Sequence, residues 1–168
     1  MSSWANVVSL SVILLYVIPA VRWFQTGRWT EWLALVGMMG TVALNETVKH
    51  ALIGTQSPRP ANAADCNLWV NDGPCGGKPG MPSGHSAQVS FLAAYYLQEA
   101  FLTPSPNTAP TSPAFRVFAL LLVGYALAVM YSRYVKQCHT PTQILMGALL
   151  GTSASVIVLK KAYQWRDK

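Results

Sequence analysis

Five apolar stretches alternate with polar, proline-containing segments along the chain. They run over residues 4–21, 32–53, 86–102, 115–131 and 140–159. The first is an uncharged run of 18 residues, which as a helix rising about 1.5 Å per residue covers most of a hydrocarbon core about 30 Å thick. The pattern therefore predicts an all-α fold: one domain over residues 1–168, built as a polytopic transmembrane helix bundle of about five spans.

The second predicted span is the least regular. Asn45, Glu46 and Lys49 fall in its last turns, and charge inside a bilayer is costly unless it faces a polar cavity, so such residues usually mark function. Glu46 and Lys49 are also three positions apart, which favours an ion pair on the helix surface. Prolines interrupt the loops after the second and third spans, and we expect both loops to be irregular.

Composition supports a membrane protein and argues against a nucleic-acid-binding one. Hydrophobic residues make up 52% and charged residues 11% of the chain, whereas about a quarter of a soluble domain is charged. The net charge of +6 is scattered over both predicted membrane faces without a basic patch, so anionic headgroups explain it better than nucleic acid. The predicted partners are therefore membrane lipids.

Basic residues also predict the orientation. Five crossings place the 55–84 and 132–139 loops on one side, and the 22–31 and 103–114 loops with the C-terminal tail on the other. The tail side carries seven Lys and Arg residues against five, so the positive-inside rule predicts a cytoplasmic C-terminus and motif loops that face the lumen or the extracytoplasmic side.

Two of the three cysteines lie in the same predicted lumenal loop. Cys66 and Cys75 have eight residues between them, a spacing that a disulfide closes, and the alternative is two unpaired thiols in a reducing compartment. Cys138 is left over. A catalytic pair of Cys138 and His139 is disfavoured, because adjacent residues on a helix point about 100° apart.

Three polar clusters share the predicted lumenal face. They are Lys49 with Arg59-Pro60, then Pro82-Ser83-Gly84-His85, and then Ser132-Arg133 followed by His139. Lys and Arg neutralise phosphate oxygens, while one histidine can attack phosphorus and another can protonate the leaving oxygen. Their convergence indicates phosphoryl chemistry.

The 82–85 motif directly precedes an apolar helical run. Ser83 is therefore predicted to be an N-cap, so that the first amides of the helix point at an anion, and Gly84 leaves that approach open. Taken alone, a four-residue match of this kind fits an ordinary capped helix start better than an anion site, and the other two clusters change that balance.

These motifs resemble the type 2 phosphatidic acid phosphatase superfamily. Its membrane members dephosphorylate lipid phosphates and diphosphates, and its soluble relatives include vanadium haloperoxidases. The resemblance covers roughly residues 45–155 and implies that His139 is a nucleophile forming a phosphohistidine and that His85 is the general acid. It also implies that the phosphoryl oxygens are held by Lys49, Arg59, Ser83, Gly84 and Arg133.

Two departures from the family pattern stand out. Nine residues separate Lys49 from Arg59, where the family usually has six, which suggests an insertion of three within residues 54–58. Gln143 stands where the family has the Asp that orients the nucleophile. Its carbonyl can accept the imidazole N–H but brings no negative charge, so we expect slower turnover.

The sequence thus predicts a lipid phosphate or polyprenyl diphosphate phosphatase that needs no metal or other cofactor. The alternative is a catalytically weakened structural or lipid-binding subunit of a larger membrane assembly, which the two departures favour. Gly147, Gly151 and Ser155 form a stripe of small residues that lets the last span pack closely within the bundle. Membrane-protein partners and a homo-oligomer stay open.

Overall fold

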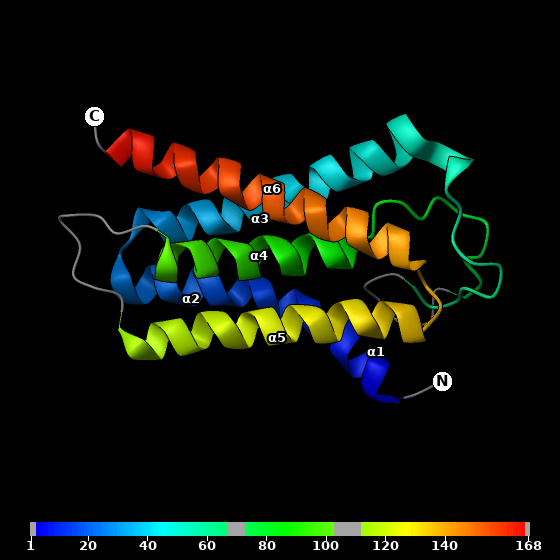
Figure 1. Cartoon of the computed structure of the whole chain (residues 1–168), viewed down its shortest axis with the longest axis horizontal. Helices are drawn as coiled ribbons and strands as arrows, with labels where there is room; N and C mark the ends of the chain where they lie inside the picture. The colour runs from blue at the N-terminus through cyan, green and yellow to red at the C-terminus, as the bar shows by residue number, and fades with distance from the viewer. Residues whose placement is uncertain (1–2, 67–72, 103–111, 167–168) are drawn as a thin grey trace.

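The computed structural model describes residues 3–66, 73–102 and 112–166, and every regular element within those ranges is a helix (Figure 1). The described chain begins with three consecutive helical segments, which are α1 (Ser3–Leu10), the 3₁₀ helix η1 (Ser11–Tyr16) and α2 (Val17–Thr26). Next come α3 (Trp29–Thr47), the π-helical η2 (Val48–Ile53) and η3 (Gly54–Gln56), followed by α4 (Gly84–Phe101), α5 (Pro113–Val135) and α6 (Pro141–Arg166). The all-α prediction is confirmed.

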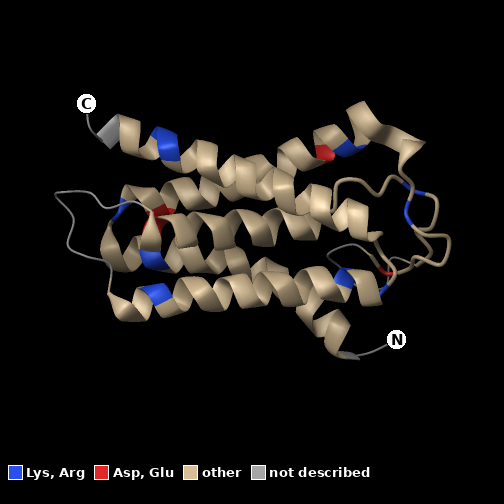
Figure 2. Cartoon of the chain, viewed as in Figure 1, with Lys and Arg blue, Asp and Glu red and all other residues tan. Residues whose placement is uncertain are grey.

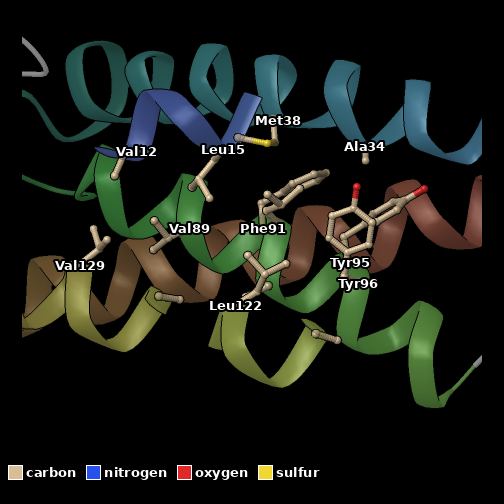
Figure 3. Close-up of a cluster of buried hydrophobic side chains, with 14 of the residues drawn as sticks. Val12, Leu15, Ala34, Met38, Val89, Phe91, Tyr95, Tyr96, Leu122 and Val129 are labelled. Carbon is tan, nitrogen blue, oxygen red and sulfur yellow. The ribbon is translucent and has the colours of Figure 1, made fainter. Parts of the chain in front are cut away.

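Helix α4 lies at the centre of the bundle and packs against α3, α5 and α6 (Figure 1). Two thirds of its 18 residues are buried, because it has neighbours on nearly every side. Phe91, Tyr95 and Leu92 are fully buried there, with Met38 of α3 and Leu122 of α5 against them (Figure 3). This core fixes the direction in which the start of α4 points.

Three helical stretches are long and apolar enough to cross a membrane: Trp4–Thr26, Pro113–Val135 and Pro141–Gln164. Helices α3 and α4 fall on the second and third predicted spans, but both bury polar side chains such as Asn45 and Glu99. Among the described residues, the charged positions lie toward the two ends of the bundle and not in its middle (Figure 2), as expected of membrane-spanning helices. The count of about five spans stays a prediction.

Small residues let α6 approach α4 closely, as the sequence predicted. A Cβ on Gly151 would lie 2.0 Å from the backbone oxygen of Ala87, and a Cβ on Gly147 would lie 2.4 Å from that of Ser83. The Ser155 hydroxyl accepts a hydrogen bond of 3.0 Å from the Gln98 amide. The stripe therefore serves the packing of α6 inside the bundle.

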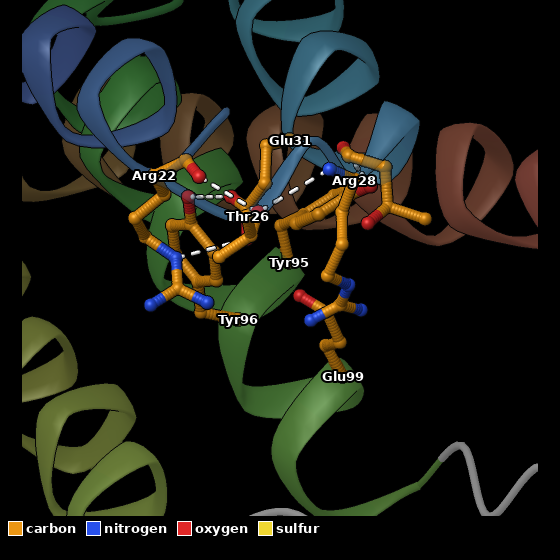
Figure 4. Close-up of polar contacts among 8 residues, drawn as sticks. Arg22, Thr26, Arg28, Glu31, Tyr95, Tyr96 and Glu99 are labelled. Carbon is orange, nitrogen blue, oxygen red and sulfur yellow. Dashed lines mark hydrogen bonds and ion pairs between the residues drawn. The ribbon is translucent and has the colours of Figure 1, made fainter. Parts of the chain in front are cut away.

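A polar cluster closes the opposite end of the bundle (Figure 4). Glu31, which is fully buried, accepts from Arg22 at 2.9 Å and from the Tyr96 hydroxyl at 2.6 Å. Arg28 pairs with Glu99 across the same end. Because these carboxylates are paired, their burial is tolerated, and the pairs tie the α2–α3 hairpin to the end of α4.

We predict that Gly151→Ala destabilises the protein. The added methyl meets backbone atoms, which cannot move aside as a side chain can, so we expect a loss of about 1–3 kcal/mol. The measurement is the thermal unfolding midpoint in detergent. Gly124→Ala in α5 is the matched control, because a Cβ there meets nothing within 4 Å, and equal midpoints for the two variants would contradict the packing argument.

Candidate active site

The three polar clusters lie at one end of the bundle, the end where η2, the start of α4, the end of α5 and the start of α6 come together (Figure 1). The loop between η3 and α4 folds over this end. Arg59 N–H donates to the Lys78 carbonyl at 2.9 Å, and Gly80 N–H donates to the Ser57 carbonyl at 3.0 Å. Every residue expected from the sequence to bind phosphate therefore borders a single region.

Ser83 caps α4, as predicted. Its backbone is extended, and its hydroxyl accepts from Ser86 N–H at 3.5 Å. Its own N–H donates to the Gln143 carbonyl at 3.0 Å, which holds the start of α4 against the start of α6. The amides that follow in the first turn of α4 are unpaired within the helix and suit an anion.

Lys49 reaches this helix start despite the longer spacing to Arg59. A Cβ on Gly84 would lie 3.9 Å from Lys49 Nζ and 3.3 Å from Asn45 Nδ2. Lys49 is 6% exposed and pairs with Glu46, so the ion pair expected from the sequence is present. The bare backbone of Gly84 leaves room between the ammonium group and the helix.

His139 is held by the side chain of Gln143. Its Nδ1 lies 3.2 Å from Gln143 Oε1, which also accepts from Thr140 N–H at 3.2 Å. Gln143 Nε2 lies 2.8 Å from the Pro58 carbonyl, which fixes the amide with its oxygen toward the histidine. His139 therefore donates through Nδ1–H, and its Nε2 carries the lone pair.

Both histidines are neutral near pH 7. Burial, followed by the positive charges of Arg59 and Arg133, lowers the pKa of His139 to about 3. Burial, followed by the charges of Arg133 and His139, lowers the pKa of His85 well below its usual value. His85 Nε2 has no hydrogen-bond partner among the residues that the structure describes. Two uncharged imidazole rings thus face the same cations.

Arg133 is fully buried and is positioned by residues that the sequence did not single out. It donates to the Ser9 hydroxyl at 2.8 Å and to the Cys66 carbonyl. Lys136, also buried, donates to the Asp65 carbonyl at 2.9 Å. In the sequence, Ser9 stands out only as a small polar residue inside an apolar run, which does not indicate that it contacts Arg133. Arg59, in contrast, is half-buried.

The cysteine pairing differs from both alternatives drawn from the sequence. Cys66 is bonded to Cys138, with the Cα atoms 5.4 Å apart, and Cys75 is a buried free thiol. The Cys66–Cys75 bond, one of the two alternatives, was wrong, and so was the pair of unpaired thiols, because the loop folds across the α5–α6 turn and brings Cys66 to Cys138. The disulfide ties the loop to the residue beside His139.

His139 also borders an open pocket at the outer face of the site. The pocket has a volume of about 290 Å³ and is lined in part by Asn62, Tyr134, Gln137 and Thr140. It gives the imidazole a route to solvent. Within the described ranges, no group of three or more His, Cys, Asp or Glu side chains is arranged to hold a metal ion.

A family model described as the PAP2 superfamily matches residues 30–167. The chain belongs to the PAP2 superfamily. This PAP2 chain is 31% identical over 120 residues to dolichyldiphosphatase 1 of Homo sapiens, covering 69% of the chain and 48% of that protein. It is 24% identical over 139 residues to lipid phosphate phosphatase epsilon 2, chloroplastic, of Arabidopsis thaliana, covering 77% and 46%. It therefore spans about half the length of the curated relatives it matches.

A solved structure shares the PAP2 fold. The transmembrane PAP2-type phosphatidylglycerolphosphate phosphatase from Bacillus subtilis superposes with a TM-score of 0.67 at 22% identity, covering 100% of this chain and 80% of that one. Because that protein is a transmembrane one and three helices here are long and apolar enough to cross a bilayer, the chain is an integral membrane protein.

We predict that acid destabilises the protein through His139. The folded state holds this imidazole neutral while the unfolded chain protonates it below about pH 6.5, so unfolding takes up a proton and stability falls as pH falls from 6.5 toward 3. His139→Asn should flatten the fall of the thermal midpoint between pH 6.5 and 4.5. The exposed His50 provides the control, and a fall as steep in His139→Asn as in His50→Asn would count against a neutral His139.

Proposed function

We propose that this PAP2 chain hydrolyses a phosphate or diphosphate group on a membrane lipid through a phosphohistidine on His139. The observation that carries the proposal is the buried imidazole of His139, held through Nδ1 by Gln143 and surrounded by the charges of Lys49, Arg59 and Arg133. A neutral imidazole with a free lone pair among cations suits attack on a phosphate.

In the first step, His139 Nε2 attacks phosphorus and the bond from phosphorus to the leaving oxygen breaks. Binding of the phosphate dianion raises the pKa of His85, which takes up a proton from solvent and then gives it to the leaving oxygen. Lys49, Arg59, Arg133 and the amides at the start of α4 hold the equatorial oxygens, on which the transition state spreads its charge.

In the second step, water attacks the phosphohistidine and the bond between phosphorus and nitrogen breaks. His85, now neutral, takes the proton from the water, and inorganic phosphate leaves. His139 is then neutral again, and His85 returns its proton to solvent when the phosphate leaves. The cycle needs no group beyond the side chains and backbone amides of the site.

An apolar groove between α3 and α6 supports a lipid as the substrate. It has a volume of about 360 Å³ and is lined by residues including Leu33, Val36 and Ile157. Thr41 borders the groove and lies two helical turns before Lys49 on the same face of the helix. A hydrocarbon chain in the groove would place its headgroup at the cations. The names of the relatives favour polyprenyl diphosphates and glycerol-based lipid phosphates.

We further propose that the chain crosses the membrane about five times, with the site on the lumenal or extracytoplasmic side. The helices alternate in direction, so all three motifs meet at one end (Figure 1). The Cys66–Cys138 disulfide lies at that end, and disulfides persist in oxidising compartments. The excess of basic residues at the other end agrees with a cytoplasmic C-terminus.

A structural or lipid-binding subunit is the competing function, and catalysis separates the two. We expect purified protein to release phosphate from at least one of a polyprenyl diphosphate, phosphatidylglycerol phosphate and phosphatidate. His139→Ala should lower the rate by at least about 10³-fold, because the nucleophile is lost. His50→Ala, which removes an exposed histidine, should retain the rate of the unaltered protein. If the unaltered protein releases phosphate from every lipid no faster than His139→Ala does, the phosphatase proposal fails and the subunit function is retained.

The topology is tested by cysteine labelling in sealed cells or vesicles. The two bonded cysteines and buried Cys75 leave a low background. A cysteine at exposed Ala61 should react with a membrane-impermeant maleimide from the extracytoplasmic side. A cysteine at exposed Lys160 should react only after the membrane is permeabilised. The reverse pattern would invert the proposed orientation.

A further inference from the structure

The two departures from the family pattern meet in space. Gln143 Nε2 lies 2.8 Å from the carbonyl of Pro58, 3.2 Å from the carbonyl of Ser57 and 3.1 Å from the Ser57 hydroxyl. Ser57 and Pro58 belong to the lengthened segment between Lys49 and Arg59. The residue that replaces the usual Asp is therefore bonded to the segment that carries the extra length.

The oxygen of the Gln143 amide faces hydrogen-bond donors, and its nitrogen faces hydrogen-bond acceptors. Its Oε1 faces His139 Nδ1 and the N–H of Thr140. Its Nε2 faces backbone carbonyls, which only accept hydrogen bonds. A carboxylate at this position would place a negative oxygen against those carbonyls and would remove the donor that Gln143 offers them, so that the Ser57 carbonyl would keep only the Gly80 N–H. An Asp would also be one methylene shorter.

Gly80 holds the amide from the remaining side. Its N–H donates to the Ser57 carbonyl at 3.0 Å. A Cβ on Gly80 would lie 2.7 Å from Gln143 Nε2 and 2.8 Å from Oε1. Because its φ lies outside the left-handed range, an alanine here would act on the Gln143 side chain rather than strain the backbone.

We infer that Gln143 is a positioning residue for His139, matched to the lengthened 54–58 segment, and not a damaged form of an orienting aspartate. The inference rests on the proposed phosphatase function and adds to it a specific requirement. The nucleophile needs a side chain at 143 that accepts toward His139 and donates toward residues 57 and 58. Restoring the aspartate of the family pattern removes that donor.

The first test is a double-mutant cycle between Gly80 and Gln143. Gly80→Ala pushes the amide away from His139, so kcat should fall roughly tenfold to a hundredfold with KM changed less than about threefold. In a Gln143→Ala background the methyl has room, and Gly80→Ala should cost less than about twofold. Gly124→Ala in α5, where a Cβ meets nothing within 4 Å, is the matched control. Additive losses would overturn the inference.

The second test changes the chemistry of the amide. Gln143→Asp should lower kcat below that of the unaltered protein. Gln143→Glu keeps the length and donates to the Pro58 carbonyl only when protonated, so its activity relative to the unaltered protein should fall as pH rises. A kcat raised by Gln143→Asp, or a Gln143→Glu profile parallel to that of the unaltered protein, would refute the positioning role.

A readout without turnover separates failure of this inference from failure of the proposed function. In ¹⁵N-histidine NMR spectra of the protein in detergent, His139 should show the tautomer protonated at Nδ1, and both Gln143→Ala and Gly80→Ala should mix the two tautomers. Unchanged tautomers in these variants would refute the positioning role even in an active enzyme. Changed tautomers in a protein that releases no phosphate would support the positioning role of Gln143 and would contradict the proposed phosphatase function.

Discussion

The gathering of positive charge at one end of an apolar helix bundle is the constraint on which the rest of the structure depends. Lys49 and Arg133 are buried there, and a buried charge is costly unless it is paired or hydrogen-bonded. Glu46 pairs with Lys49, while Arg133 donates to an uncharged hydroxyl and a backbone carbonyl. A phosphate bound at this end would place negative charge beside Lys49 and Arg133.

This constraint explains why a loop, and not a further helix, covers the site. Backbone carbonyls solvate cations without cancelling their charge, and an irregular segment exposes carbonyls that a helix would use internally. The Cys66 and Asp65 carbonyls serve Arg133 and Lys136 in this way. The Cys66–Cys138 disulfide fixes this part of the loop against the α5–α6 turn. The same constraint keeps both histidines neutral, because each would add a further positive charge.

The sequence predicted the parts of this arrangement that depend on local chemistry. The N-cap at Ser83, the Glu46–Lys49 pair and the packing stripe on α6 follow from spacing along one helix, and the structure contains all three. It could not predict Ser9 beside Arg133 or the Cys66–Cys138 bond, which join segments more than 70 residues apart. The first contact depends on how α1 packs against α5, and the second on how a loop without regular structure folds. Residue spacing carries no information about either.

The environment of Gln143 also bears on how an amide can serve where a carboxylate is usual. An aspartate would stabilise the imidazolium with a full charge, whereas an amide offers only a dipole. That dipole is strengthened here, because hydrogen bonds donated to the Ser57 and Pro58 carbonyls polarise the amide and make Oε1 a better acceptor. Cooperative strengthening of this kind amounts to about 10–30% per bond, which stabilises an imidazolium less than a full negative charge does. The lengthened segment therefore offsets part of the lost carboxylate, and it does so without burying a second ion beside the phosphate, where a negative charge would oppose binding of the substrate.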